Sequence, residues 1–316
     1  MSTILVTGAS GFVGSHALPA LLAAGHRVVA LVRAPEDGDR VLGRLERHRR
    51  DQVEIRTGDV THPDTLPAAL AGVDGVLHLV AIPRDYRGGA DLRLVNTEGT
   101  RAVVVAMTAA GVGRLVHMGA MGVTDDPDLH YASSKARAEA IVAASGLDWT
   151  ILKPSLQFGP GDGFFNIVAN LVRLSPGIVP VPGDGRSRFQ PIHADDVARV
   201  AVAAFADPTT IGSAFELGGP RYWTYREIME EVLRGMGKRR VLVPMPVPLI
   251  RLVAASAEAA RLRFFPVATD QLRQLKLDNI GPLEGVRQQL GWDPQSMEGN
   301  LTHLRRPIRE QEPEAG

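Results

Sequence analysis

The sequence predicts an α/β fold: a doubly wound parallel sheet with a smaller, partly discontinuous C-terminal domain. Three observations support this prediction. Apolar, β-branched runs alternate with alanine-rich helical stretches, the second run is apolar almost throughout, and proline and glycine cluster after Pro154. Strands that alternate with helices form parallel β–α–β units. Helices cover both faces of such a sheet, so its strands need no polar side.

The order of the elements predicts the domain boundaries. Expected strands lie at 4–6, 27–32, 53–56, 75–80, 114–118 and 149–152. A helix over 194–206 and a strand over 213–217 can each return to this sheet. Loops are expected at 159–161 and 176–185. We expect a large domain over 1–155 with returning elements near 190–218, a smaller domain over 156–189 and 219–308, and a disordered tail over 309–316.

The composition is that of an ordinary globular protein. The chain has 316 residues, with 35 basic and 35 acidic side chains, so nothing in its charge favours nucleic acid. The basic runs 44–50 and 238–240 lack interleaved aromatic residues and are expected to be solvated surface. The absence of cysteine excludes disulfides and fits a reducing compartment. No signal peptide and no metal-binding histidine spacing are apparent, so we expect a cytoplasmic protein without structural metal.

A glycine-rich string joins the first strand to the first helix. Gly8 permits the tight turn, Gly11 lets a pyrophosphate approach the backbone, and Gly14 lets the helix pack close to the sheet. The phosphates then lie on N–H groups at a helix N-terminus. This context predicts a dinucleotide-binding domain of the Rossmann type. The residues expected to form the cradle are Thr7, Gly8, Ser10, Gly11, Phe12, Val13 and Gly14.

The end of the second strand bears on the choice between NAD and NADP. A carboxylate there would bind the adenosine ribose and repel a 2′-phosphate, whereas a basic residue would pair with that phosphate. This strand is followed by Arg33, with Ser10 or Arg40 as helpers. The sequence therefore favours NADP(H) over NAD(H), and the alternative is that Arg33 only faces solvent.

Tyr131 and Lys135 stand four residues apart at the start of a helical stretch, so both lie on one face. A cation beside a phenol favours the phenolate, which would lower the pKa of Tyr131 toward neutrality. Such a hydroxyl can donate or accept a proton while a cofactor carries hydride. The pair is therefore a candidate catalytic site.

Together these motifs resemble the extended or atypical short-chain dehydrogenases/reductases, an epimerase/dehydratase-like family. The glycine string matches TGxxGxxG, Tyr131 and Lys135 match YxxxK, and the run from Asn96 to Thr100 matches NxxGT. The resemblance covers nearly the whole chain and implies an oxidoreductase with Asn96, Tyr131 and Lys135 as catalytic residues. It also implies cofactor contacts at Asp59, Val60, Val80, Ala81, Ile82, Tyr131, Lys135, Pro154, Ser155 and Gln157.

The C-terminal third narrows this resemblance. Segments 215–220, 223–227, 270–272 and 277–279 look like the subgroup similar to the 39 kDa accessory subunit of respiratory complex I. That likeness implies tight NADP(H) binding, often without catalysis. It further implies that a homodimer would form through the helices of Asn96 and Tyr131, although the oligomeric state is left open. His193, Asp195 and Asp196 are interpreted as helix caps and anchors rather than catalytic groups.

One departure from the family pattern concerns the strand before Tyr131. Working reductases have a Ser or Thr there to stabilise the developing charge on the substrate oxygen, whereas this chain has Gly119 and Ala120. Backbone N–H groups, Thr124, Ser133 or Ser155 are the alternatives. Two functions stay open: an NADPH-dependent oxidoreductase acting on a small carbonyl or related substrate, and a non-catalytic NADPH-holding scaffold, assembly or redox-sensing protein.

The substrate and the partners are less constrained. Aromatic and polar candidates for lining a substrate pocket are Arg84, Tyr86, Gln157, Phe164, Phe165, Asn166, Arg188 and Tyr222. An amphipathic helix is expected over 249–265, which would pack on its own core, on a membrane surface or on a partner protein.

Overall fold

The computed structural model describes residues 1–85, 87–246, 248–249, 278–283 and 285–308. Two compact units are present. One consists of Met1–Pro154 with Ala194–Glu216, and the other of Ser155–His193 with the described residues from Leu217 onward. The expected tail over 309–316, and all but the first residue of the helix expected over 249–265, lie outside the described residues.

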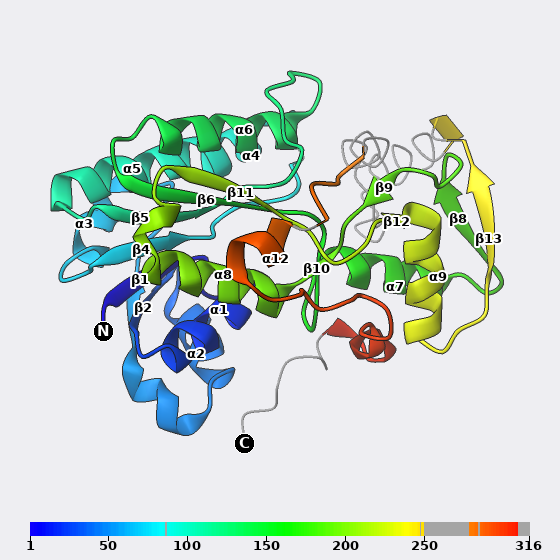
Figure 1. Cartoon of the computed structure of the whole chain (residues 1–316), viewed down its shortest axis with the longest axis horizontal. Coiled ribbons are helices and arrows are strands. Elements are labelled where there is room, and N and C mark those ends of the chain that lie inside the picture. Colours follow the sequence, from blue (N-terminus) through cyan, green and yellow to red (C-terminus); the bar gives the residue numbers. More distant parts are fainter. Residues whose placement is uncertain (86, 247, 250–277, 284, 309–316) are drawn as a thin grey trace. The chain divides into compact units, whose positions relative to one another are not determined.

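A seven-stranded sheet forms the centre of the first unit (Figure 1), which confirms the predicted fold class. Across the sheet, the strands are β11 (Ser213–Leu217), β6 (Asp148–Pro154), β5 (Arg114–Met118), β4 (Gly75–His78), β1 (Thr3–Thr7), β2 (Arg27–Val32) and β3 (Val53–Thr57). Strands β1 to β6 pair in parallel. The strand order reverses at β1, so the carboxyl ends of β1 and β4 form a switch point, where α/β sheets bind ligands.

Helices cover both faces of this sheet, as its buried strands require. In Figure 1, α3, α5 and α6 lie on one side and α1 and α8 on the other. The helical segments of this unit are α1 (Phe12–Ala23), α2 (Pro35–Gly43), η1 (Arg47–Gln52), η2 (Pro63–Thr65), α3 (Leu66–Ala69), α4 (Ala90–Leu92), η3 (Arg93–Glu98), α5 (Gly99–Ala110), α6 (His130–Ala143), α8 (Ala194–Ala206) and η4 (Pro208–Thr210).

The contact between α1 and α8 explains the acidic residues that open α8. Asp195 Oδ1 lies 2.6 Å from His16 Nδ1 on α1, and Asp196 is fully buried in the first turn, 3.4 Å from Arg199. The contact with His16 anchors α8 to α1, as expected of Asp195, whereas the contact of Asp196 with Arg199 lies within α8 itself.

Two predicted boundaries are wrong. β4 ends at His78 rather than at residue 80, because its neighbour β1 ends at Thr7, the partner of His78 in the register. The expected loop over 176–185 contains a strand, β8 (Ile178–Pro182), which pairs in parallel with β13 (Val241–Met245). A pairing between segments so far apart in the chain leaves no local pattern in the sequence.

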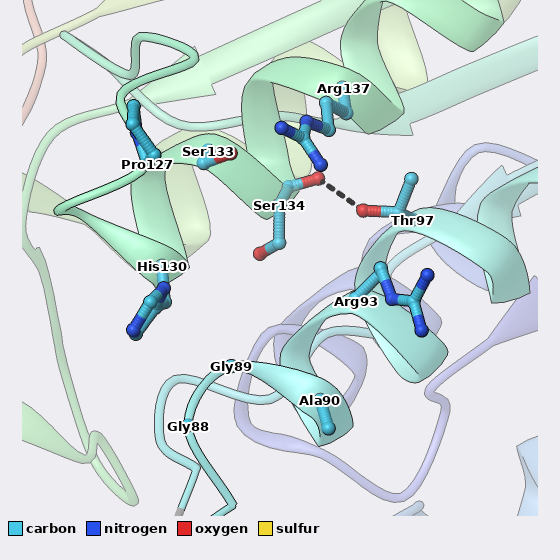
Figure 2. Close-up of a pocket in the computed structure, with 10 residues that line it drawn as sticks. All are labelled: Gly88, Gly89, Ala90, Arg93, Thr97, Pro127, His130, Ser133, Ser134 and Arg137. Atoms are coloured by element: carbon cyan, nitrogen blue, oxygen red, sulfur yellow. Dashed lines mark hydrogen bonds between the residues drawn. The ribbon is translucent and has the colours of Figure 1, made fainter.

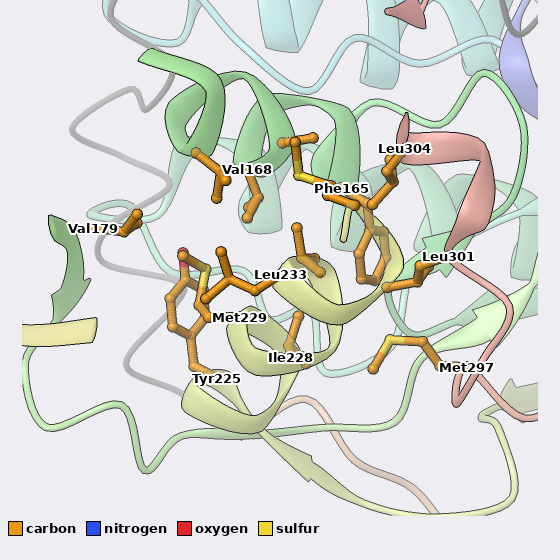
Figure 3. Packing of buried hydrophobic residues seen from close by; sticks show 14 of the residues in the cluster. Phe165, Val168, Val179, Tyr225, Ile228, Met229, Leu233, Met297, Leu301 and Leu304 are labelled. Carbon is orange, nitrogen blue, oxygen red and sulfur yellow. The ribbon is translucent and has the colours of Figure 1, made fainter. Parts of the chain in front are cut away.

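The second unit is built around its own apolar core. Figure 3 shows Phe165 and Val168 on α7 packed with Ile228 and Met229 on α9, and both helices contact Leu301 and its neighbours. Besides β8 and β13, the elements of this unit are β7 (Gln157–Phe158), α7 (Phe164–Leu174), β9 (Arg188–Phe189), β10 (Ile192–His193), β12 (Trp223–Thr224), α9 (Tyr225–Gly235), α12 (Gly285–Leu290) and η5 (Thr302–Arg305). Thr224 and Glu227 form a capping box that fixes the start of α9.

Candidate active site

Gly8 and Gly14, at either side of the turn from β1 into α1, have no room for a side chain. An added Cβ at Gly8 would lie 3.1 Å from the backbone of Leu79 and Val80, and Gly8 has φ +73°. A Cβ at Gly14 would lie only 2.5 Å from the Ala9 carbonyl oxygen. Gly11 is the N-cap of α1. Neither a side-chain cap nor an acidic residue satisfies the N–H groups in the first turn of this helix. An uncapped N-terminus beside bare backbone fits a pyrophosphate, so these residues suit a dinucleotide.

A buried hydrogen-bond chain links the ends of β1 and β4 to the helix of Asn96. His78 Nδ1 lies 2.7 Å from Thr7 Oγ1, and His78 Nε2 lies 3.1 Å from Thr100 Oγ1. Thr100 donates its own hydrogen to the Asn96 carbonyl, so Nε2 must carry the imidazole proton. Burial and the charge of Lys135 lower the pKa of His78 to about 3. The neutral ring therefore holds the two strand ends together.

His117, on β5, lies beside His78 of β4, and the two rings stack with their centroids 5.3 Å apart. Neither ring nitrogen of His117 has a hydrogen-bond partner among the described residues. Burial, with the nearby charge of Lys135, holds the pKa of His117 well below its usual value. This ring is therefore also neutral.

Asn96 acts as a clamp on the segment that follows β4. Its Oδ1 accepts the N–H of Ile82 at 2.8 Å, and its Nδ2 donates to the Ile82 carbonyl at 3.1 Å and to Ser134 Oγ at 3.0 Å. Asn96 lies in η3, a π-helical turn within a longer helix, and such turns are frequent at functional sites. The whole amide is therefore engaged, and Asn96 fixes the backbone of Ile82, the last of the predicted cofactor residues Val80, Ala81 and Ile82.

Tyr131 and Lys135 lie on α6, as predicted, but they differ in their surroundings. Lys135 is buried, and its Nζ donates to the Met118 carbonyl at the end of β5. Burial lowers the pKa of Lys135 to about 8, against a smaller opposing effect of Glu139. Tyr131 is half-buried, and its hydroxyl has no hydrogen-bond partner in the described part of the chain.

The predicted effect of Lys135 on Tyr131 is wrong. Burial, together with the negative charge of Glu139, raises the pKa of Tyr131 to about 12 instead of lowering it toward neutrality. The ammonium group of Lys135 is directed to the Met118 carbonyl, so its charge does not offset the cost of burying a phenolate. Tyr131 therefore carries its proton at neutral pH and is suited to act as an acid.

The backbone donors at the end of β5 are all occupied. The N–H of Gly119 bonds to the Leu152 carbonyl at 2.7 Å, that of Ala120 to Glu139 Oε1 at 3.1 Å, and that of Met121 to the Pro154 carbonyl at 3.0 Å. The expectation that these N–H groups could replace a Ser or Thr hydroxyl is therefore wrong. Each donor already stabilises the loop that carries it.

The hydroxyl alternatives do not fill this role either. Ser133 donates to Asp125 at 2.5 Å, and Thr124 is exposed. Ser155, in the second unit, donates to Asn279 Oδ1 at 2.5 Å. The Tyr131 hydroxyl, in contrast, donates to no described residue.

The adenosine end of the cradle contains one residue that the sequence analysis missed. Arg33 is exposed and forms no ion pair with the described residues, whereas the predicted helper Arg40 pairs with Asp37 at 2.9 Å. Arg44 instead donates to the Ser10 carbonyl of the glycine-rich loop at 2.8 Å. Its position one helical turn after Arg40 is the signal that could have identified it.

Asp59 is held in place just after β3. Its Oδ1 accepts the N–H and the hydroxyl of Thr61, both at 2.8 Å. Burial raises the pKa of Asp59, but the bonds from Thr61 and the positive charges of His62 and Arg33 outweigh it, so the pKa lies below its usual value. Val60 is buried against Gly99, where a Cβ would lie 2.8 Å from it. The adenine contact of Asp59 stays a prediction.

Several residues expected to line a substrate pocket instead stabilise the second unit. Phe165 is fully buried in its core, and Asn166 bonds to the buried Asp162. Arg188 forms a two-point ion pair with Asp278, and the Tyr222 hydroxyl donates to the Gly281 carbonyl at 2.8 Å. Gln157 keeps a buried Oε1 with no partner among the described residues. Tyr86 lies outside the described residues.

A cavity of about 350 Å³ opens between the start of α6 and the segment from Gly88 to Thr97 (Figure 2). Arg93, His130 and Arg137 contribute basic side chains, but Arg137 already pairs with Asp125 at 2.8 Å. Tyr131 and Lys135 are not among the lining residues. The sequence analysis gave no indication of this cavity.

The described residues contain neither a cluster of metal ligands nor a helix that could span a membrane. Across the described ranges, no group of three or more His, Cys, Asp or Glu side chains is arranged to hold a metal ion. Within those ranges, too, every helix falls short of the length and apolar character that crossing a bilayer requires.

Comparison with known proteins agrees with this geometry. The profile of a family described as NAD(P)H-binding matches residues 8–208. A mitochondrial NADH dehydrogenase [ubiquinone] 1 alpha subcomplex subunit 9 from Arabidopsis thaliana is 27% identical over 283 residues, covering 88% of this chain and 68% of that protein. A 2-alkyl-3-oxoalkanoate reductase from Stenotrophomonas maltophilia is 29% identical over 334 residues, covering 96% and 98%.

Solved structures share the fold. A dTDP-glucose 4,6-dehydratase from Streptomyces venezuelae with NAD bound has a TM-score of 0.71 at 24% identity, covering 98% of this chain and 97% of that one. The similarity extends through both units of the chain.

Proposed function

The chain belongs to the NAD(P)H-binding family, in its extended short-chain dehydrogenase/reductase branch, and from this premise we propose that it is an NADPH-dependent reductase of carbonyl compounds. The observation that carries the proposal is the Tyr131 hydroxyl, on the half-buried side chain one helical turn before Lys135, protonated at neutral pH and without a partner among the described residues. A group that keeps its proton serves reduction, in which the substrate oxygen gains one.

The residues have separate roles in cofactor binding and proton donation. The glycine-rich loop and the N-terminus of α1 hold the pyrophosphate, and Arg33 pairs with the 2′-phosphate. When bound, the reduced nicotinamide supplies the hydride. Tyr131 donates its proton to the substrate oxygen, while Lys135 and Asn96 hold the strand ends on which the cofactor rests.

The relatives indicate which substrate classes should be tested first. The relative from Stenotrophomonas maltophilia is named for reducing a 2-alkyl-3-oxoalkanoate, and it aligns with nearly the whole chain. We propose 3-oxoalkanoates as the first carbonyl substrates for this chain. Sugar nucleotides are the second class, on the likeness in fold to a dTDP-glucose dehydratase.

A non-catalytic role is the second candidate, and one observation favours it. All three backbone N–H groups at the end of β5 are engaged, and neither Gly119 nor Ala120 has a hydroxyl, so the usual stabiliser of the substrate oxygen is missing. A protein of this kind would hold NADPH tightly and turn it over slowly. The relative from Arabidopsis thaliana is named as a subunit of an NADH dehydrogenase, which fits a cofactor-holding role within an assembly.

The experiment that distinguishes the two roles compares the unaltered protein with the Tyr131→Phe variant. Any nucleotide released on denaturation is identified, and the stripped protein is titrated with NADPH and NADH, followed by nicotinamide fluorescence. Turnover is then measured with 3-oxoalkanoates and a wider carbonyl panel. We expect Tyr131→Phe to lower kcat by about 10²- to 10⁴-fold while NADPH affinity stays within about twofold. Tight NADPH binding without oxidation by any carbonyl would favour the non-catalytic role.

A further inference from the structure

The carboxylate of Glu139 occupies the space beside Gly119. A Cβ added at residue 119 would lie 2.5 Å from Glu139 Oε1 and 3.1 Å from Ile151 Cγ2. Glu139 follows Tyr131 by eight residues and Lys135 by four on α6, so the three side chains share one face of the helix. The Glu139 carboxylate thus occupies the space that a side chain at residue 119 would fill.

Two contacts hold this carboxylate in position. Oε1 accepts the N–H of Ala120 at 3.1 Å, and Oε2 lies 3.4 Å from Lys153 Nζ on β6. The Glu139 side chain is only 14% exposed. The largely buried carboxylate is therefore held on two sides, by a backbone N–H after β5 and by a lysine of β6.

We propose that Glu139 is a positioning residue for Tyr131 and Lys135: it fixes the end of β5 through Ala120 and places a negative charge that acts on both side chains. The residue takes the place of the side chain that Gly119 lacks. This inference deepens the proposed function, and it rests on that function only for its effect on turnover.

The charges around the pair agree with this role. Glu139 raises the pKa of both Lys135 and Tyr131, in each case as a smaller effect beside that of burial. The other titratable groups near Lys135 are His78 on β4 and His117 on β5, and both rings stay neutral because they are buried. Lys153 on β6 faces the carboxylate itself. Glu139 is therefore the anion that favours protonated Lys135 in the described surroundings.

The test substitutes Glu139→Gln, which keeps an acceptor for the Ala120 N–H and removes the charge. The chain has four lysines, so ¹³C labelling at lysine Cε gives a simple NMR spectrum, in which Lys135→Met identifies the Lys135 signal. In the unaltered protein we expect Lys135 to titrate at about 8. In Glu139→Gln we expect this midpoint to fall by about one pH unit, because the negative charge that favours protonated Lys135 is removed.

Two variants serve as controls. Glu98→Gln removes a helix-surface glutamate that pairs with Arg101 at 3.0 Å, and the Lys135 midpoint should not move. Lys153→Met leaves Glu139 without its counter-charge, so the midpoint should rise. An unchanged midpoint in a folded Glu139→Gln protein would overturn the proposal. If that variant does not fold, an unchanged midpoint in Lys153→Met overturns it instead, and a rise supports it.

The titration needs neither cofactor nor substrate, so it separates this inference from the proposed function. A shifted Lys135 midpoint in a protein that oxidises no NADPH supports the role of Glu139 and counts against the reductase. Where turnover is present, the pH dependence of kcat in Glu139→Gln should move toward lower pH with the midpoint, and a purely structural role would leave it in place.

Discussion

The cofactor cradle and the end of β5 use their backbone donors in opposite ways. At the start of α1 the helix has neither a side-chain cap nor an acidic residue in its first turn, so its N–H groups are left for an anion. At Gly119, Ala120 and Met121 each N–H already bonds within the protein. One region is built to receive a ligand, whereas the backbone of the other is satisfied without one.

This difference separates binding from turnover. The motifs that hold a dinucleotide are complete and are supported by the network of His78 and Asn96. The part of the site that would stabilise charge on a substrate oxygen is reduced to Tyr131. A chain with these two regions can bind a nicotinamide dinucleotide tightly and still be a slow catalyst.

The largest effect is expected from Gly14→Ala, which attacks the binding region. Its Cβ would lie 2.5 Å from the Ala9 carbonyl oxygen and 2.6 Å from that of Gly8, both backbone atoms of the cradle. The start of α1 must move away, so NADPH affinity should fall by about a hundredfold or more, with a loss of stability of about 1–3 kcal/mol. Fluorescence titration and thermal unfolding measure the two effects.

Gly43→Ala is the matched control, because Gly43 lies in the last turn of α2 and a Cβ there meets nothing within 4 Å. It should bind NADPH as the parent protein does and be at least as stable. Unchanged affinity in Gly14→Ala would mean that the loop is not the pyrophosphate site.

The cradle could be predicted from the sequence because its chemistry is local. A glycine must stand where a turn has positive φ or where a Cβ would strike backbone, and eight consecutive residues contain that information. The sheet is predictable for the same reason, since each of its strands has its own apolar run. The end of β4 differs from the prediction because Leu79 and Val80 continue the apolar pattern, although the neighbouring strand β1 already ends at Thr7, opposite His78.

The catalytic end depends on contacts that spacing alone does not give. The spacing of four residues from Tyr131 to Lys135 places both on one face, but only the structure shows that Lys135 turns to the Met118 carbonyl. The pKa of Tyr131 consequently rises, where the sequence predicted a fall. In the second unit, β8 and its partner β13 are separated by tens of residues, and the Pro-rich segment around Pro180 gave no sign of the pairing.

Restoring a hydroxyl at the end of β5 should produce the next largest effect. Ala120→Ser adds an oxygen donor where reductases of this family have one, so kcat on a reducible carbonyl should rise by about tenfold to a hundredfold. Gly119→Ser should not do so, because its Cβ would lie 2.5 Å from Glu139 Oε1 and displace the carboxylate. Single-turnover oxidation of NADPH distinguishes the two variants. Equal rates in Ala120→Ser and the parent would show that the missing hydroxyl does not limit turnover.

The smallest effects are expected at the adenosine end, where two arginines should act differently. Arg33 is exposed beside the cradle, so Arg33→Ala should weaken NADPH binding by about tenfold, or about 1.4 kcal/mol, and leave NADH unchanged. Arg44 bonds to the Ser10 carbonyl, so Arg44→Ala should loosen the loop and weaken both nucleotides alike, by about threefold. Titration of each variant with both nucleotides measures the two ratios. Equal losses of NADPH and NADH in Arg33→Ala would mean that Arg33 does not read the 2′-phosphate, and the preference for NADPH would then need another source.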